Sequence, residues 1–216
     1  DNPLLAAVSI ASLGIMVIAA KVHRHLASWQ WTLLATIAIS VACAFSFGLL
    51  MGSEVTAFLT TVEAMFAAIN SKQQDAKISL DLTESMLLGI VATLLAIGSI
   101  MSLMLARWWQ AGIYNPGGFQ KEFHSFKIEA KVAVILVAVL LAGQFMSKSS
   151  QIWSDLAVLP LLIAGIALVH CAVKLLDQGR QWLAFLYVGF ILAGKPVTVI
   201  LLVLGLTDSL IDLRSR

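Results

Sequence analysis

Long apolar runs separated by short polar segments cover most of this chain. A transmembrane helix needs roughly 20 consecutive, mostly apolar residues, and several runs approach or exceed that length. The pattern predicts an all-α fold, a polytopic transmembrane helix bundle with about six spans. The predicted spans cover residues 4–20, 31–51, 86–106, 130–146, 156–176 and 182–206.

The segment between the second and third runs has a different period. Its apolar residues recur at intervals of three and four, while Glu54, Thr61 and Glu63 fall outside that stripe. This is the period of a helix with one apolar face. We therefore predict an interfacial amphipathic helix at 54–69, lying on the membrane surface or over the bundle. The stripe consists of Val55, Phe58, Leu59, Val62, Met65, Phe66 and Ile69.

Two local features indicate how the spans are placed. Trp29 and Trp31 stand at the start of the second run, where an aromatic belt at the membrane surface is expected. Small residues repeat at every fourth position in three of the spans, and such spacing lets helix backbones approach closely. The small-residue pairs are Ala38 with Ala42, Ala92 with Ala96, and Ala138 with Ala142.

Composition excludes several classes of protein. The chain is 60% hydrophobic and 12% charged, whereas soluble domains carry about 25% charged residues, so the lipid bilayer is its first predicted partner. The net charge of +2 comes without a clustered basic face, which argues against binding to nucleic acid. Cys43 and Cys171 fall in apolar runs and the four histidines are dispersed, so we predict no metal site and no cofactor. No nucleophile stands in register with a base, and we predict no enzyme.

The distribution of basic residues predicts the orientation, because loops rich in Lys and Arg stay in the cytoplasm. We expect a multi-pass membrane protein with its basic loops in the cytoplasm and the 54–69 helix outside. If the last run crosses once, Arg214 and Arg216 lie outside; if it turns back, they lie inside. The basic loops hold Lys21, Arg24, Arg107, Lys121, Lys127, Lys174 and Arg180, and the opposing loops hold Lys72, Lys77 and Lys148.

Lys195 is the first candidate ligand-binding residue. It lies inside the last apolar run between Gly194 and Pro196, which predicts a broken helix of the kind that forms transporter sites. A buried charge in the membrane is costly, so the side chain should face protein, water or a ligand. The alternative is a structural kink whose lysine reaches the surface or pairs with Asp155 or Asp208.

His170, within the fifth run, is the second candidate ligand-binding residue. We expect that it could line the same cavity as Lys195. The alternative is a histidine that simply forms a hydrogen bond with a neighbouring helix.

The segment from Arg107 to Phe119 is the candidate partner or interface loop. Gly and Pro mark a tight turn after a charged, aromatic helix end. The loop would dock a membrane or cytoplasmic partner or an anionic head group; the alternative is a turn whose aromatics anchor at the interface. Its candidate residues are Arg107, Trp108, Trp109, Tyr114, Asn115, Pro116, Gly117, Gly118 and Phe119.

Two runs resemble a known family. The sequence ARWWQAGIYNPGGFQKEF at 106–123 and the sequence LGLTDSLIDLR at 204–214 resemble the YybS-like family of uncharacterised bacterial multi-pass membrane proteins. The resemblance implies a location in the bacterial inner membrane. It also implies further amino-terminal spans, so residues 1–216 are expected to form one transmembrane domain of a longer protein. The family is similar in character to the substrate-capture subunits of vitamin transporters.

Two functions remain open from the sequence. The broken last run favours a small-molecule binding or transport component with an energising partner. The scarcity of convergent polar residues favours a non-catalytic membrane scaffold or assembly protein. The sequence leaves the substrate and the oligomeric state open.

Overall fold

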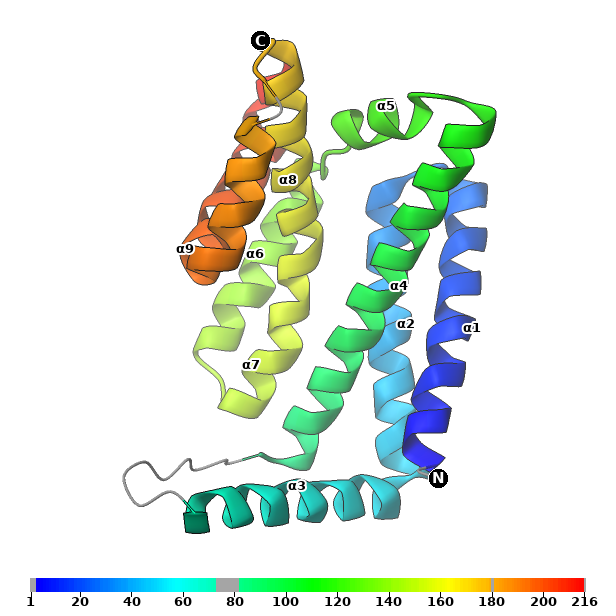
Figure 1. The fold of residues 1–216 in the computed structure, drawn as a ribbon, viewed down its shortest axis with the longest axis vertical. Helices are drawn as coiled ribbons and strands as arrows, with labels where there is room; N and C mark the ends of the chain where they lie inside the picture. The colour runs from blue at the N-terminus through cyan, green and yellow to red at the C-terminus, as the bar shows by residue number, and fades with distance from the viewer. Residues whose placement is uncertain (1–2, 73–81, 180, 216) are drawn as a thin grey trace.

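The structure, a computed structural model, describes residues 3–72, 82–179 and 181–215, and these residues form a helical bundle without strands (Figure 1). The all-α fold is confirmed. Lys77, Arg180 and Arg216, which entered the orientation argument, lie outside the described residues. The helices are α1 (Pro3–Leu26), α2 (Trp29–Leu50), α3 (Gly52–Lys72), α4 (Glu84–Tyr114), α5 (Gly118–Ser125), α6 (Ala130–Gln144), α7 (Lys148–Ser154), α8 (Val158–Leu175) and α9 (Gln181–Ile211).

Within the described residues, five helical segments are long and apolar enough to cross a membrane: α1, α2, α4, the stretch Lys148–Leu175 that joins α7 to α8, and α9. The remaining expected span, 130–146, is α6, an apolar helix of 15 residues and thus shorter than the other five. Length and composition together make the chain a multi-pass membrane protein.

The predicted amphipathic helix is present as α3, which lies across one end of the bundle (Figure 1). Its apolar stripe is buried only near its start, where Val55 and Leu59 pack against Leu87 and Leu88 of α4. Met65 and Ile69 further along are exposed. This half-covered stripe agrees with a helix that rests on a membrane surface.

The second crossing element, α5, lies across the opposite end of the bundle (Figure 1). Phe126 and Ile128 follow it directly and insert into the main core, which also contains Trp29 of α2 and Leu161 of α8. These two apolar side chains attach the α5 segment to the bundle, because pulling them out would expose apolar surface that is otherwise fully packed.

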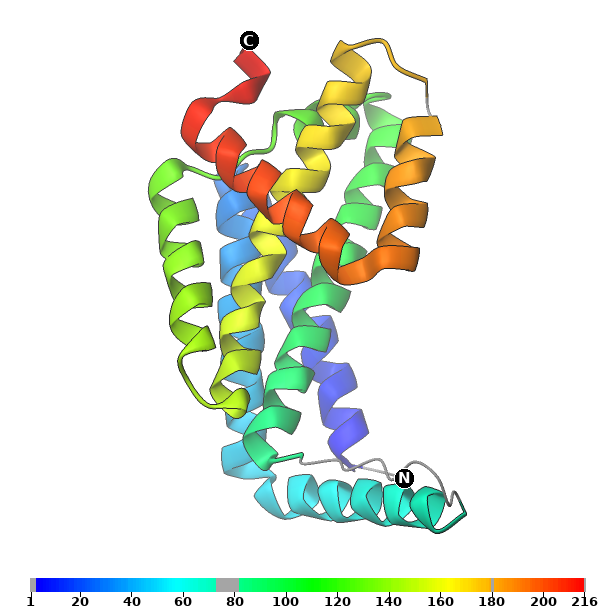
Figure 2. The ribbon, with the colours of Figure 1, turned by 90° about the vertical axis from the view of Figure 1, so that its left-hand side faces the viewer.

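Although α9 is long and apolar enough to cross a membrane, it is a hairpin, so the single crossing expected over 182–206 is not formed. Its backbone is non-helical at Gly194 (φ 19°, ψ −87°), next to Pro196. Figure 2 shows that the residues before this point run away from the α5 end and that those after it run back. The predicted break is confirmed, and of the two alternatives for the carboxyl end the structure has the turn-back. Arg214 therefore lies at the same end as the α1–α2 turn and α5.

Glycine allows the returning arm of α9 to pack closely on α8. A Cβ atom at Gly165 would lie 2.0 Å from the backbone oxygen of Leu201, and one at Gly205 would lie 2.5 Å from that of Leu161. The two helices cross with backbone against backbone, which small residues permit. This crossing fixes the α9 hairpin against the rest of the bundle.

Candidate functional site

Two large cavities lie on either side of α5 in the part of the chain that the structure describes. The polar cavity, about 920 Å³, is bounded by the α1–α2 turn, by α4 around Arg107 and by α5 around Glu122. The apolar cavity, about 910 Å³, lies between α4, α5, α8 and the first arm of α9. Both are therefore at the end of the bundle where the basic loops gather.

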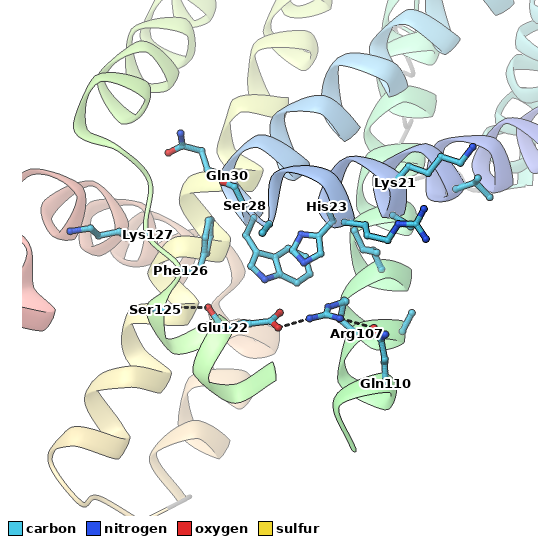
Figure 3. Close-up of a pocket in the computed structure, with 17 residues that line it drawn as sticks. Lys21, His23, Ser28, Gln30, Arg107, Gln110, Glu122, Ser125, Phe126 and Lys127 are labelled. Atoms are coloured by element: carbon cyan, nitrogen blue, oxygen red, sulfur yellow. Dashed lines mark hydrogen bonds and ion pairs between the residues drawn. The ribbon is translucent and has the colours of Figure 1, made fainter. Parts of the chain in front are cut away.

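An ion pair joins α4 to α5 inside the polar cavity. Figure 3 shows Arg107 and Glu122 pointing toward each other from the two helices. Arg107 Nη2 donates to Glu122 Oε1, and Arg107 Nη1 donates to Gln110 Oε1 at 2.6 Å. Both members of the ion pair are about two-thirds buried, so water screens the pair less than it screens a surface pair.

Among the residues that line the polar cavity, four buried side-chain atoms have no hydrogen-bond partner among the described residues: Trp29 Nε1, Gln30 Nε2, Arg107 Nε and Glu122 Oε2. Trp29 is only 8% exposed and Gln30 only 5%. Leaving a buried polar group unpaired costs about 1–3 kcal/mol. Three of the four atoms are N–H donors, so the cavity is suited to a molecule that supplies acceptor oxygens.

Ring contacts hold the Trp29 indole in place. Its centroid lies 4.3 Å from that of His23 and 6.2 Å from that of Phe119. His23 is held in turn by a hydrogen bond of 3.1 Å between its Nδ1 and Thr32 Oγ1. The indole N–H is therefore a fixed donor, and a ligand need not order it on binding.

Gln30 is oriented through its other amide atom. Its Oε1 accepts a hydrogen bond of 2.6 Å from the backbone N–H of Glu129, just before α6. This bond links the start of α2 to the segment after α5 and leaves only the Gln30 Nε2 group unpaired. Figure 3 shows the Gln30 amide pointing away from Arg107 and Glu122.

Cations outnumber anions around the polar cavity. Lys21, Arg24, Arg107 and Lys127 line it, against the single carboxylate of Glu122. Lys127 also forms an exposed ion pair with Asp212 at 2.8 Å, which reduces its share of the positive potential. The remaining excess favours an anionic occupant, since a cleft lined by one sign of charge concentrates the opposite sign.

The apolar cavity brings together two sets of residues that the sequence singled out separately. His170 lines it, and so do Trp108, Trp109, Gly117 and Phe119 from the predicted interface loop. Its wall includes a hydrogen bond of 2.9 Å between His170 Nε2 and the Tyr187 hydroxyl. The described residues contain no group of three His, Cys, Asp or Glu side chains placed to hold a metal ion.

His124 lies at the polar edge of the apolar cavity. Burial lowers the pKa of His124 below its usual value, and the nearby His170, Lys174 and Arg214 lower it further. His124 lies on α5, outside the candidate spans and at the basic end of the bundle. A neutral imidazole there avoids adding charge beside an apolar wall.

The structure does not bring Lys195 to either cavity. It lies exposed at the reversal of α9, within electrostatic reach of Asp155. Asp208, the other suggested partner, accepts from Arg214 Nε at 2.8 Å instead. Lys195 and His170 therefore do not line a common wall of these two cavities.

The predicted loop is shorter than expected, because α4 continues to Tyr114 and only residues 115–117 form the turn before α5. Asn115 ends α4, Gly117 has φ +82°, and Gly118 is buried so closely that a Cβ there would contact the Asn115 side chain. Pro116 and Tyr114 are exposed. Arg107 faces the polar cavity while its neighbours Trp108 and Trp109 face the apolar one.

Sequence reasoning missed several residues of the polar cavity. Trp29 was assigned to the membrane surface, whereas it is buried; Trp31, two positions on, is 48% exposed as expected. Gln30 and Glu122 gave no signal except that each is a polar residue beside aromatic ones. The useful signal would have been a polar residue at the first turn of an otherwise apolar helix.

Comparisons with protein-family models, with curated proteins and with solved structures gave no match. The class of this chain therefore comes from its own architecture. It is a multi-pass, all-α membrane protein with a polar cavity at its basic end.

Proposed function

We propose that this protein is a small-molecule-binding or transport component of a bacterial inner membrane, and that the polar cavity is its binding site. The observation that carries the proposal is the set of unpaired, buried donors on residues that line the cavity. If these groups served only to pack the bundle, the protein would be more stable with them paired or replaced by apolar groups. A ligand with acceptor atoms would satisfy them.

The position of the polar cavity supports the same proposal. It lies at the end that carries the basic loops, which the positive-inside rule assigns to the cytoplasm. In this orientation the ligand would be exchanged on the cytoplasmic side. The resemblance to the YybS-like family, and through it to substrate-capture subunits, stays a prediction that agrees with this role.

The test compares the small molecules that co-purify with the wild type and with a variant whose polar cavity is obstructed. Ala106 lines the cavity and is exposed, so Ala106→Trp should obstruct it with an indole ring without removing a polar group. Ala138, exposed on α6, is the matched control as Ala138→Trp. Each variant is purified in a neutral detergent, denatured, and its released small molecules are measured by mass spectrometry.

We expect a small molecule that is enriched with the wild type and with Ala138→Trp and is lost with Ala106→Trp. Equal recovery from all three proteins, or no enriched molecule in any, would contradict the proposal. Size-exclusion chromatography of each variant checks that the fold is retained.

A scaffold function is the alternative, and one observation favours it. Near the end of α4, the side chains of Trp109, Ile113 and Tyr114 are largely exposed, as an interface for another protein would require. This function predicts that Trp109→Ala and Tyr114→Ala release a specific partner chain while no small molecule is retained by any variant. The mass-spectrometric comparison therefore separates the two functions.

A further inference from the structure

The first turn of α2 borders the polar cavity. Ser28, Trp29 and Gln30 all line the cavity, and α2 begins at Trp29. Ser28 has extended backbone angles and its side chain makes no capping hydrogen bond. The first amides of a helix have no partner within the helix, and they carry the positive end of the helix dipole.

A helix start alone does not define a site, but here a second observation points to a ligand. Trp29 Nε1 and Gln30 Nε2 belong to side chains that are more than nine-tenths buried, and neither atom has a partner among the described residues. Arg107, which also lines the cavity, has a third unpaired donor, Nε. Helix amides, neutral N–H groups and a guanidinium together are the groups that proteins use for phosphate.

Resting on the proposed function, we infer that the polar cavity binds a phosphoryl group, with the first turn of α2, Trp29 Nε1 and Arg107 as its donors. Lys21 and Arg24 add positive charge at the rim. A phosphoryl group is preferred over a single carboxylate because it presents three acceptor oxygens to donors that come from different walls. The group belongs either to a soluble phosphorylated molecule or to the head of an anionic phospholipid.

Glu122 sets a limit on this site and gives a sharp test. Its carboxylate holds Arg107 through one oxygen, and its other oxygen is unpaired. A bound phosphoryl group would be repelled by this charge and would compete with it for Arg107. Removing the charge while keeping the shape should therefore strengthen binding.

The experiment uses the full chain in neutral detergent with two probes at constant ionic strength. The probes are inorganic phosphate and a short-chain, water-soluble phosphatidylglycerol, and binding is followed by thermal stabilisation. Trp29→Phe removes one donor and keeps a ring. Trp31→Phe makes the same change at a half-exposed tryptophan that does not line the cavity.

We expect Trp29→Phe to weaken binding by about tenfold, the value of one hydrogen bond to a charged group. Trp31→Phe should leave binding unchanged, and Glu122→Gln should tighten it severalfold, a result that partial unfolding cannot produce. Stabilisation by inorganic phosphate identifies a soluble phosphorylated ligand, and stabilisation by phosphatidylglycerol alone identifies a lipid head group.

The inference is overturned if neither probe stabilises the wild type, or if Trp29→Phe binds as tightly as Trp31→Phe. It also fails if Glu122→Gln weakens binding. Should Ala106→Trp still abolish a co-purifying molecule while both phosphate probes fail, the proposed function stands and only its phosphoryl chemistry is wrong.

Discussion

The crossing of α8 with the returning arm of α9 makes the sharpest stability prediction. Gly165→Ala would place a Cβ atom 2.0 Å from the backbone oxygen of Leu201 and 2.7 Å from its carbonyl carbon. Ordinary contact begins near 3.4 Å, so the new atom lies about 1.4 Å too close. Since the obstructing atoms are backbone, a change of side-chain rotamer cannot relieve the clash.

The expected magnitude follows from overpacking in a close-packed interior. Extra methyl groups in such sites cost about 1–3 kcal/mol, occasionally more, and a rigid backbone obstacle belongs at the upper end. For a chain of this size a loss of about 3 kcal/mol lowers the midpoint of unfolding by roughly 6–12 °C. The assay is thermal unfolding in detergent, followed by loss of the monodisperse chromatographic peak.

A second glycine provides the control. Gly98 lies on an exposed face of α4, with no heavy atom within 4 Å of a built Cβ. Gly98→Ala should be neutral or slightly stabilising, because alanine is the better helix former by about 1 kcal/mol. If Gly165→Ala unfolds at the same temperature as Gly98→Ala, the α9 hairpin does not pack on α8 as described.

Three further predictions use the same unfolding assay. Asp208 is 1% exposed and pairs with Arg214, so Asp208→Asn should lower the free energy of unfolding by about 3 kcal/mol. Lys127→Ala breaks an ion pair that is nearly half exposed, so it should lower the free energy of unfolding by less than about 1 kcal/mol. The pKa of His124 is lowered in the folded protein, so the unfolded chain takes up the proton more readily. The free energy of unfolding should therefore fall as the pH drops through about 6.5, and His124→Gln should reduce that fall. Gly117 has φ +82°, so Gly117→Ala should cost about 1 kcal/mol and Gly117→Asn less, because asparagine tolerates this backbone conformation better.

Local signals in the sequence predicted the elements well. The amphipathic stripe gave α3, the Asn-Pro-Gly-Gly run gave the turn before α5, and Gly194 with Pro196 gave the break in α9. Each of these depends on a few neighbouring residues, because the backbone restrictions of Gly and Pro and the period of a helix act over one or two turns. Such features need no knowledge of what packs against them.

The faces of the apolar helices were harder to predict. Ala92 and Ala96 are fully buried, as expected, but Ala38 and Ala42 on α2 are exposed, and so are Ala138 and Ala142 on α6. A helix in lipid is apolar all round, so hydrophobic period cannot tell its packed face from its lipid face. The face of α2 that is buried carries Thr32, Thr36, Ser40 and Ala44.

The polar cavity escaped prediction for a different reason. Trp29 and Glu122 are far apart in the sequence and meet only because α5 folds back across the end of the bundle. Lys195 was singled out as a charge inside an apolar run, and the structure places it, exposed, at the reversal of α9. The charge of Lys195 in an apolar run thus marked a turn. The unpaired Trp29 side chain, in contrast, is at the start of α2, which the sequence analysis placed at the membrane surface.

α5 is the element on which both cavities depend. Glu122 ties it to α4 through Arg107, and Arg214 Nη1 near the carboxyl end donates to the backbone oxygen of His124. The adjacent residues Glu122 and Phe123 face different cavities, so a shift of α5 that widens one cavity must move a wall of the other. An anion that drew Arg107 away from Glu122 would release one of these two attachments, and the apolar cavity beside His170 would then change shape with the polar one.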